Sequence, residues 1–141
     1  MAEAIARALA TEMGLADVTI ASAGTSAWDG APASDGALLV AMEQGIDLNQ
    51  HRSQMLSREL VSEAALVLVM GPHHLERVAA LGGKEKAHLL VGFASRGESV
   101  TPVADPFSGD LDAYRTTFEE LRRTIGQVIS RVASDRRASG A

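Results

Sequence analysis

The segment of this chain best suited to chemistry is Asp105-Pro106-Phe107-Ser108-Gly109-Asp110. Proline fixes its own φ angle and pushes the preceding residue toward an extended backbone, so the Asp105 carboxyl group is held on a rigid turn. A carboxylic acid held in this way can protonate a leaving group, provided that its environment keeps the proton on it. The structural alternative is that Asp105 begins a turn and Asp110 caps the helix that follows.

Three other side chains in irregular segments are candidates for a site. His51 follows Asn49-Gln50 and is either a base or a hydrogen-bonded structural group. Ser22 ends a β-branched run, where its hydroxyl either supports a neighbouring loop or closes a local turn. Trp28 is the only tryptophan and lies in a loop with Gly and Pro, which suits either a ligand-pocket wall or a cover for the core edge.

The pair His73-His74, with Glu76 two residues further on, invites a metal site. Adjacent side chains on a helix point about 100° apart, so the two imidazoles are not expected to converge on one ion. Gly82-Gly83 lacks the glycine spacing of a nucleotide-binding loop and is expected to end a helix. We therefore expect neither a metal nor a cofactor.

Composition narrows the class of protein. The 141 residues suit one domain, predicted over 1–134, with a polar tail at 135–141. With 46% apolar residues but no apolar run of bilayer length and no secretory leader, the chain is expected to be cytoplasmic and without membrane contact. A net charge of −5 argues against nucleic acid as a partner, because nucleic-acid binding needs a basic surface.

Cysteine is absent from the 141 residues. Disulfides, zinc–thiolate sites and thiol nucleophiles are therefore excluded for these residues.

Hydrophobic periodicity predicts an α/β fold of three layers, αβα, around a parallel sheet. The predicted helices are residues 1–13, 35–44, 57–63, 72–81 and a last helix that begins at 111. The predicted strands are 18–21, 65–70 and 87–91, and residues 92–109 are a long loop. A parallel sheet normally begins with a strand that feeds the first helix, and no such strand precedes residue 1 in this sequence.

Taken together, several segments resemble the low-molecular-weight protein phosphatase family. They are Met1-Ala2-Glu3-Ala4, Ser22-Ala23-Gly24-Thr25, Gly45-Ile46-Asp47-Leu48 with His51-Arg52, the run 65–70, and Asp105-Pro106-Phe107. The order and spacing match over nearly the whole chain. The Asp-Pro-Phe-x-Gly form, followed by Tyr114, is most similar to the bacterial branch that includes protein arginine phosphatases.

The resemblance implies roles for the candidate residues. In the family a cysteine thiolate attacks phosphorus, and an arginine and backbone N–H groups hold the phosphoryl oxygens. Asp105 matches the general acid, Trp28 and Phe107 match walls of the substrate pocket, and Ser22 with His51 matches the polar support beneath the phosphate loop. The implied partner is a phosphorylated protein, and the choice among phosphotyrosine, phosphoarginine and a small molecule stays open.

In the family the first strand, the cysteine, the phosphate loop and the arginine come before the helix that starts this chain. We therefore expect residues 1–141 to be inactive, with the central strand missing, and hypothesise a start codon assigned at an internal Met. The alternative is a non-catalytic remnant or binding module of the same fold. An unrelated receiver-type or nucleotide-binding α/β domain is a third interpretation.

Overall fold

The structure is a computed structural model that describes residues 1–15, 17–25, 29–99, 101–104, 106 and 109–138. Residues 137 and 138 are described without their side chains. The chain divides into two compact units. The first unit comprises Met1–Ser22, Ala33–His51 and Pro106–Ala141, and the second unit comprises Ala23–Pro32 and Arg52–Asp105.

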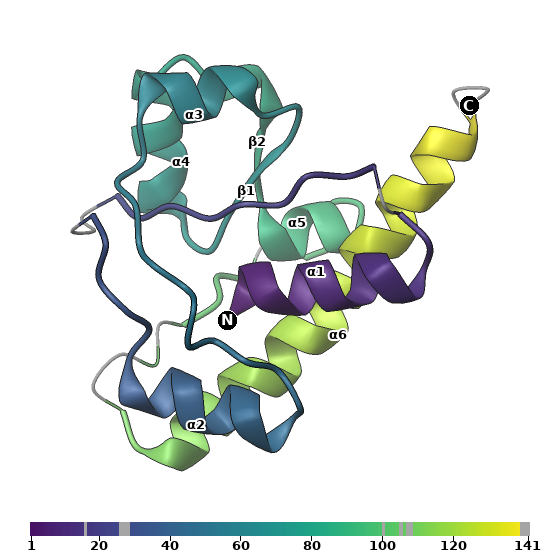
Figure 1. The fold of residues 1–141 in the computed structure, drawn as a ribbon. Coiled ribbons are helices and arrows are strands. Elements are labelled where there is room, and N and C mark those ends of the chain that lie inside the picture. Colours follow the sequence, from purple (N-terminus) through teal and green to yellow (C-terminus); the bar gives the residue numbers. More distant parts are fainter. Residues whose placement is uncertain (16, 26–28, 100, 105, 107–108, 139–141) are drawn as a thin grey trace. The chain divides into compact units, whose positions relative to one another are not determined.

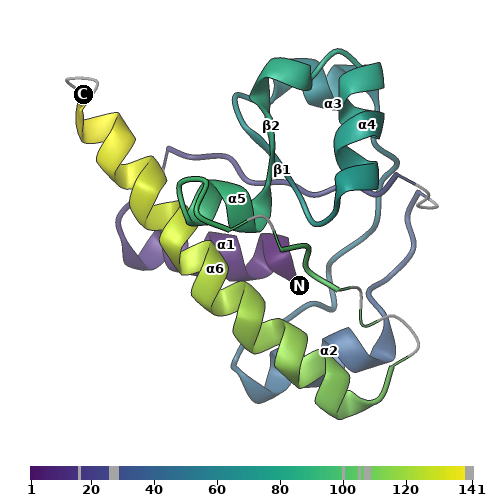
Figure 2. The ribbon, with the colours of Figure 1, turned by 180° about the vertical axis from the view of Figure 1, so that it is seen from behind.

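Three helices build the first unit: α1 (Ala2–Glu12), α2 (Asp35–Glu43) and α6 (Leu111–Ala138). The long helix α6 contacts both α1 and α2, with α2 beside the start of α6 and α1 further along it (Figures 1 and 2). The apolar residues that step by three and four along the last helix, from Leu111 to Val132, are expected to face the core; Leu111 is exposed and Val132 is half-buried, but the six between them are buried. The six are Tyr114, Phe118, Leu121, Ile125, Val128 and Ile129. Their spacing of three and four residues keeps one face of the helix in the core.

The ends of α2 follow from local chemistry. Ser34 precedes the helix in an extended conformation, and its hydroxyl donates to the Tyr114 hydroxyl at 3.2 Å. Gly45 follows the helix with φ +76°, a left-handed conformation that glycine adopts without a Cβ penalty. The predicted helix is therefore confirmed and is followed by a left-handed glycine, and the Ser34 hydroxyl contacts the Tyr114 hydroxyl of α6.

The second unit contains α3 (Arg58–Glu63), β1 (Val67–Val69), α4 (Pro72–Ala80), the 3-10 helix η1 (Lys84–Lys86), β2 (Ala87–Leu89) and α5 (Leu90–Ala94). Strands β1 and β2 pair in parallel, with Val67 opposite Ala87 and Val69 opposite Leu89. Its core cluster is Val61, Val69 and Val78, from α3, β1 and α4. The crossover through α4 is the connection that a parallel pair requires.

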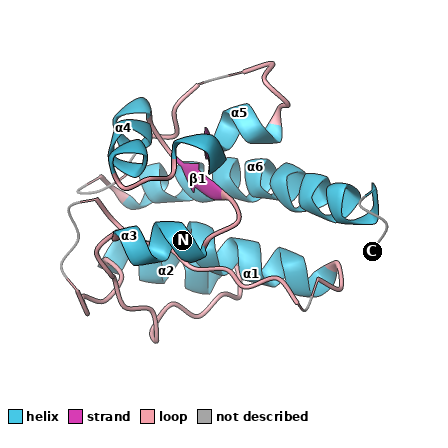
Figure 3. Ribbon diagram, turned by 90° about the horizontal axis from the view of Figure 1, so that it is seen from above, coloured by secondary structure: helices cyan, strands magenta, loops and turns pink. Residues whose placement is uncertain are grey.

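Helices outweigh strands in the described part of the chain (Figure 3). No helix among the described residues is both long enough and apolar enough to cross a bilayer. The helix α6 continues to Ala138, and Arg136 within it pairs with Asp17. The predicted division into a domain at 1–134 and a tail at 135–141 stays a prediction.

The predicted strand at 18–21 is wrong. A strand needs a neighbouring backbone to complete its hydrogen bonds, and no described segment pairs with residues 18–21. The carbonyl of Ile20 accepts instead from the Arg7 side chain, and the nearest ladder contact is an isolated parallel bridge between Gly24 and Met55.

The other two predicted strands are too long. The run 65–70 is a strand only over β1, where Val69 is buried and Val67 and Leu68 are half-buried. The run 87–91 is a strand only over β2. The short helix α5 begins at Leu90, so it replaces the end of the predicted strand and the start of the predicted loop at 92–109. The hydrogen bonds between β1 and β2 end at Val69 and Leu89. Beyond Leu89 the backbone N–H and C=O groups of residues 90–94 form hydrogen bonds within α5 instead.

Candidate functional site

Glu3, in the first turn of α1, joins two of the predicted site residues. The Ser22 hydroxyl donates to Glu3 Oε1 at 2.9 Å, and His51 Nδ1 lies 3.9 Å from Glu3 Oε2. Arg7, one turn further along α1, pairs with the same Oε2 through Nη1 at 3.0 Å. The Glu3 side chain is only 14% exposed, so three polar partners converge on a largely buried carboxylate. We call Glu3, Arg7, Ser22 and His51 the Glu3 cluster.

A tight turn delivers His51 to this cluster. Asp47 Oδ1 accepts from the backbone N–H of Asn49 at 2.8 Å and from its side-chain amide at 2.7 Å. These hydrogen bonds lower the pKa of Asp47, the backbone N–H being the larger cause. The buried side chain of Leu48 anchors the same turn, and the Leu48 carbonyl accepts from the His51 N–H at 3.1 Å.

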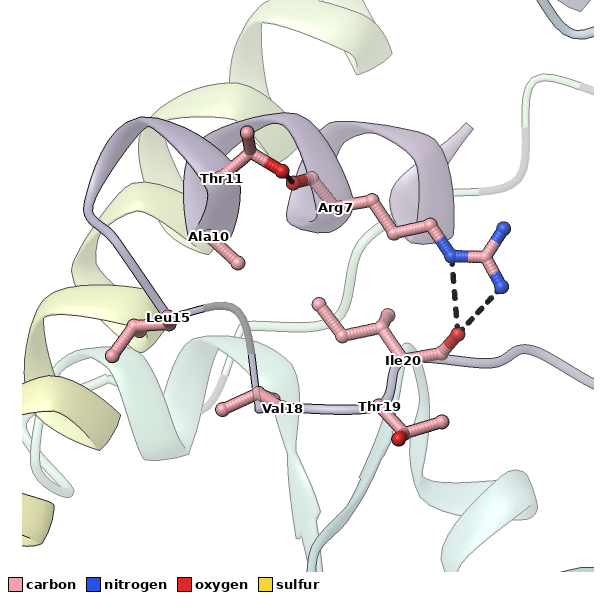
Figure 4. Close-up of a pocket in the computed structure, with 7 residues that line it drawn as sticks. All are labelled: Arg7, Ala10, Thr11, Leu15, Val18, Thr19 and Ile20. Carbon is pink, nitrogen blue, oxygen red and sulfur yellow. Dashed lines mark hydrogen bonds between the residues drawn. The ribbon is translucent and has the colours of Figure 1, made fainter.

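Arg7 also lines an open pocket of about 290 Å³ between α1 and the extended residues that follow it (Figure 4). The lining residues are Arg7, Ala10, Thr11, Leu15, Val18, Thr19 and Ile20. The Arg7 guanidinium donates to the Ile20 carbonyl from Nε at 3.2 Å and from Nη2 at 2.7 Å, and the Thr11 hydroxyl donates to the Arg7 carbonyl at 2.9 Å. Most of the lining is aliphatic, and it includes no carboxylate or imidazole, so we assign no acid–base chemistry to this pocket.

The three remaining predicted site residues, Trp28, Asp105 and Phe107, lie outside the described residues. The segment before Asp105 is anchored in the second unit, where the buried Val103 donates its N–H to the Met70 carbonyl at 3.0 Å. The roles assigned to Trp28, Asp105 and Phe107 therefore stay predictions.

Asp110 has the structural role that the sequence offered as an alternative for it. Its Oδ1 accepts from the backbone N–H of Ala113 at 2.8 Å, in the first turn of α6. A carboxylate at this position satisfies a helix donor that has no partner within the helix. Asp110 is therefore engaged as a cap.

The two adjacent histidines of α4 come closer than a helical projection suggests. The ring centroids of His73 and His74 are 3.8 Å apart, because both side chains turn toward Gly71. His74 Nδ1 accepts from the Gly71 N–H at 3.3 Å. Within the described ranges there is no group of three or more His, Cys, Asp or Glu side chains that could hold a metal ion.

Comparison with known proteins identifies the class. The family model for the low molecular weight phosphotyrosine protein phosphatase matches residues 1–138. This chain therefore belongs to the low-molecular-weight phosphatase family, and the predicted αβα fold class is that of its structural neighbours.

Individual relatives are similar along almost their whole length. A protein-arginine-phosphatase of Bacillus subtilis (strain 168) is 34% identical over 139 residues, which cover 97% of this chain and 90% of the relative. A probable low molecular weight protein-tyrosine-phosphatase, EpsP of Ralstonia nicotianae, is 32% identical over 133 residues, 94% of this chain and 86% of the relative. A solved structure of the YwlE arginine phosphatase superposes with a TM-score of 0.90 at 33% identity, covering 96% of this chain and 88% of that one. That protein is a cysteine-to-serine mutant with a phosphorylated active-site serine.

Sequence reasoning missed Glu3 and Arg7 as members of the cluster. Their spacing of four residues on α1 was the available signal, because side chains at i and i+4 lie side by side on a helix. Nothing local indicates that Ser22, 19 residues along the chain, donates to Glu3.

Proposed function

We propose that residues 1–141 form the accessory part of a low-molecular-weight protein phosphatase and do not hydrolyse phosphoprotein by themselves. The observation that carries the proposal is the absence of cysteine from the 141 residues. The solved relative bears its phosphoryl group on a serine that replaces a cysteine, which places a thiol at the nucleophile position of that relative. A phosphocysteine intermediate requires such a thiol, because the thiolate is the attacking species.

The hydroxyl of Ser22 is a supporting group in this proposal and not a replacement nucleophile. It donates a hydrogen bond to the Glu3 carboxylate, which also pairs with Arg7. The N-terminal turn of α1 has backbone N–H groups without intrahelical partners, and a phosphate loop leading into it would be supported by the Glu3 cluster from below. Ser22 and His51 would thus keep the role that the family resemblance gives them.

The chemistry on the substrate would come from the loop that contains Asp105. We assign Asp105 as the general acid that protonates the leaving group, and Trp28 and Phe107 as walls of the pocket. The substrate of the complete machinery would be a phosphorylated protein, since the relatives are named as phosphatases of protein arginine and protein tyrosine. A cytoplasmic location stays a prediction.

The test is an assay of purified residues 1–141 on p-nitrophenyl phosphate and on a phosphoarginine peptide, with the Bacillus subtilis relative as the active control. We expect no release of phosphate above buffer. Phosphate release that scales with the amount of the 141-residue protein, and persists in a metal chelator, would overturn the proposal. Binding of the phosphopeptide over its unphosphorylated form, without turnover, would identify the chain as a binding module of the same fold.

A further inference from the structure

The N-terminus of α4 is capped by a histidine side chain. The Gly71 N–H donates to His74 Nδ1 at 3.3 Å, and the His74 N–H donates back to the Gly71 carbonyl at 3.1 Å. Gly71 is buried, so its N–H depends on a protein acceptor. In the usual form of this reciprocal box the third helical residue is Glu or Gln, whose acceptor oxygen persists at neutral pH. Here the acceptor is an imidazole nitrogen.

An imidazole nitrogen accepts a hydrogen bond only while it carries no proton. Histidine side chains change charge near pH 6.5, so acidification replaces the acceptor Nδ1 by a donor. The new positive charge lies at the N-terminus of α4, where the helix dipole disfavours cations. The His73 ring, with its centroid 3.8 Å from that of His74, adds a second titratable group at the same place.

Among the described residues, the charged groups on the elements that pack against α4 lie away from its first turn. On the elements packed against it, η1 carries Lys84, Glu85 and Lys86 beyond the C-terminal end of α4, and β2 carries His88, which stacks on Phe93. Arg58 of α3 donates to the Ala80 carbonyl at the same C-terminal end. Strand β1 has no titratable side chain, and α4 itself adds Glu76 and Arg77 in its middle.

We propose that His74 is a pH-sensitive latch that holds the turn between β1 and α4 closed when neutral and releases it when protonated. The released turn includes Gly71 and adjoins Met70, whose carbonyl accepts from Val103 in the segment that runs toward Asp105. Protonation of His74 therefore loosens the carboxyl end of β1 as well as α4. The inference is independent of the proposed function, because it concerns contacts within the second unit alone.

The first test uses the unaltered chain. Nitrogen-15 NMR of the imidazoles at pH 8 should show His74 with Nδ1 unprotonated and the proton on Nε2. As His74 takes up its second proton, protection of the Gly71 amide from hydrogen exchange should fall about five- to tenfold, the ratio that one hydrogen bond of ordinary strength gives. A proton on Nδ1 at pH 8, or Gly71 protection that does not follow the titration of His74, would overturn the proposal.

Variants separate the acceptor from the charge. His74→Gln keeps an acceptor that does not titrate, so Gly71 protection should stay high and lose its pH dependence. His74→Ala should show low Gly71 protection at every pH. The control is His88→Ala, which removes a histidine of the same unit and should leave the Gly71 pH profile as in the unaltered chain. The same midpoint and amplitude in His74→Gln as in the unaltered chain would also overturn the proposal.

Discussion

At the scale of single residues, Glu3 determines how the predicted support residues are held. Its carboxylate accepts from Ser22 and pairs with Arg7, and it lies within 3.9 Å of His51. The Arg7 side chain is 60% exposed, so that pair is screened by solvent and contributes little by itself. Ser22 is exposed as well, so the cluster depends on the Glu3 carboxyl group, whose side chain is the least exposed of the group.

We expect Glu3→Gln to lower the free energy of unfolding by about 1–2 kcal/mol, because it weakens a hydrogen bond to a charged group and the ion pair with Arg7. Urea denaturation measures the change. The matched control is Glu12→Gln, an exposed residue at the other end of α1, where a change within about 0.5 kcal/mol is expected. Equal effects of the two substitutions would contradict the role of Glu3 as the centre of the cluster.

The pair of Glu43 and Arg115 predicts how stability depends on pH in acid. Arg115 donates to both carboxylate oxygens of Glu43, at 3.0 and 2.8 Å, and these hydrogen bonds, followed by the Coulomb attraction, lower the pKa of Glu43 below its usual 4.5. A carboxyl group with a lowered pKa in the folded state stabilises the fold fully above pH 4.5, and this contribution is lost as the pH falls through the lowered pKa. Glu43→Gln should remove this share of the acid sensitivity, measured as the difference between urea midpoints at about pH 7 and about pH 3.

The partner residue provides the control for Glu43. In an Arg115→Gln background, Glu43→Gln should leave the remaining pH dependence nearly unchanged. The pKa of Asp47 is lowered by its hydrogen bonds from Asn49, so Asp47 also stabilises the fold less at low pH. Its contribution to the stability lost in acid should be the same in both backgrounds. An undiminished effect of Glu43→Gln without Arg115 would show that the pair is not its source.

At the scale of elements, α6 contains one glycine that its structure does not require. An added Cβ at Gly126 meets no described atom within 4 Å, and Gly126 has no positive φ angle. Gly126→Ala should therefore raise the free energy of unfolding by about 0.5–1 kcal/mol, because alanine restricts the unfolded chain and favours the helix. Thermal and urea denaturation measure it.

Gly36 in α2 is the contrasting case for this prediction. A Cβ there would overlap the Tyr114 ring, a contact that forces α2 or the ring to move. Gly36→Ala should therefore destabilise the chain despite the better helix propensity of alanine. If both glycine substitutions stabilise, the packing of α2 on α6 is not as tight as described.

The helices and strands also show which elements local sequence patterns can predict. Helices at 2–12, 35–43, 58–63 and 72–80 were predicted to within a few residues, because their capping residues and glycine stops are local signals. The run 18–21 has strand composition, yet no described segment provides the neighbouring backbone, so composition alone misassigned it. Likewise, no local signal shows that the apolar run 87–91 changes from strand to helix at Leu90.

At the scale of the whole molecule, the path of the chain ties the two units together covalently. It passes from one unit to the other after residues 22, 32, 51 and 105. The support residues Ser22 and His51 and the predicted acid Asp105 each stand at such a passage. Sequence order alone could not show this division, since it depends on contacts between segments far apart in the chain.

The matched length gives a prediction for the complete catalytic machinery. About a tenth of the Bacillus subtilis relative lies outside the match, which covers 90% of it. If the unmatched N-terminal part of that relative is fused to Met1, the proposed function predicts phosphatase activity on a phosphoarginine peptide. Asp105→Asn in the fusion should lower kcat by about 10²–10⁴-fold, as loss of a general acid does.

Two controls make the fusion informative. The same fusion with its nucleophilic cysteine replaced by serine should be inactive, and Asp110→Asn, which alters a helix cap, should retain most of the activity. An inactive fusion that folds normally would contradict the proposed accessory role of residues 1–141. An Asp105→Asn fusion as active as its parent would contradict the assignment of the acid.

The guanidinium of Arg7 on the Ile20 carbonyl has a consequence for behaviour in concentrated solution. An extended β-branched segment with open backbone groups is a template on which other chains assemble into sheets, and natural proteins often block such edges with positively charged side chains. Arg7 occupies one acceptor of this segment with two of its N–H groups. We therefore expect Arg7 to hinder self-association through this segment, independently of any part that α1 has in catalysis.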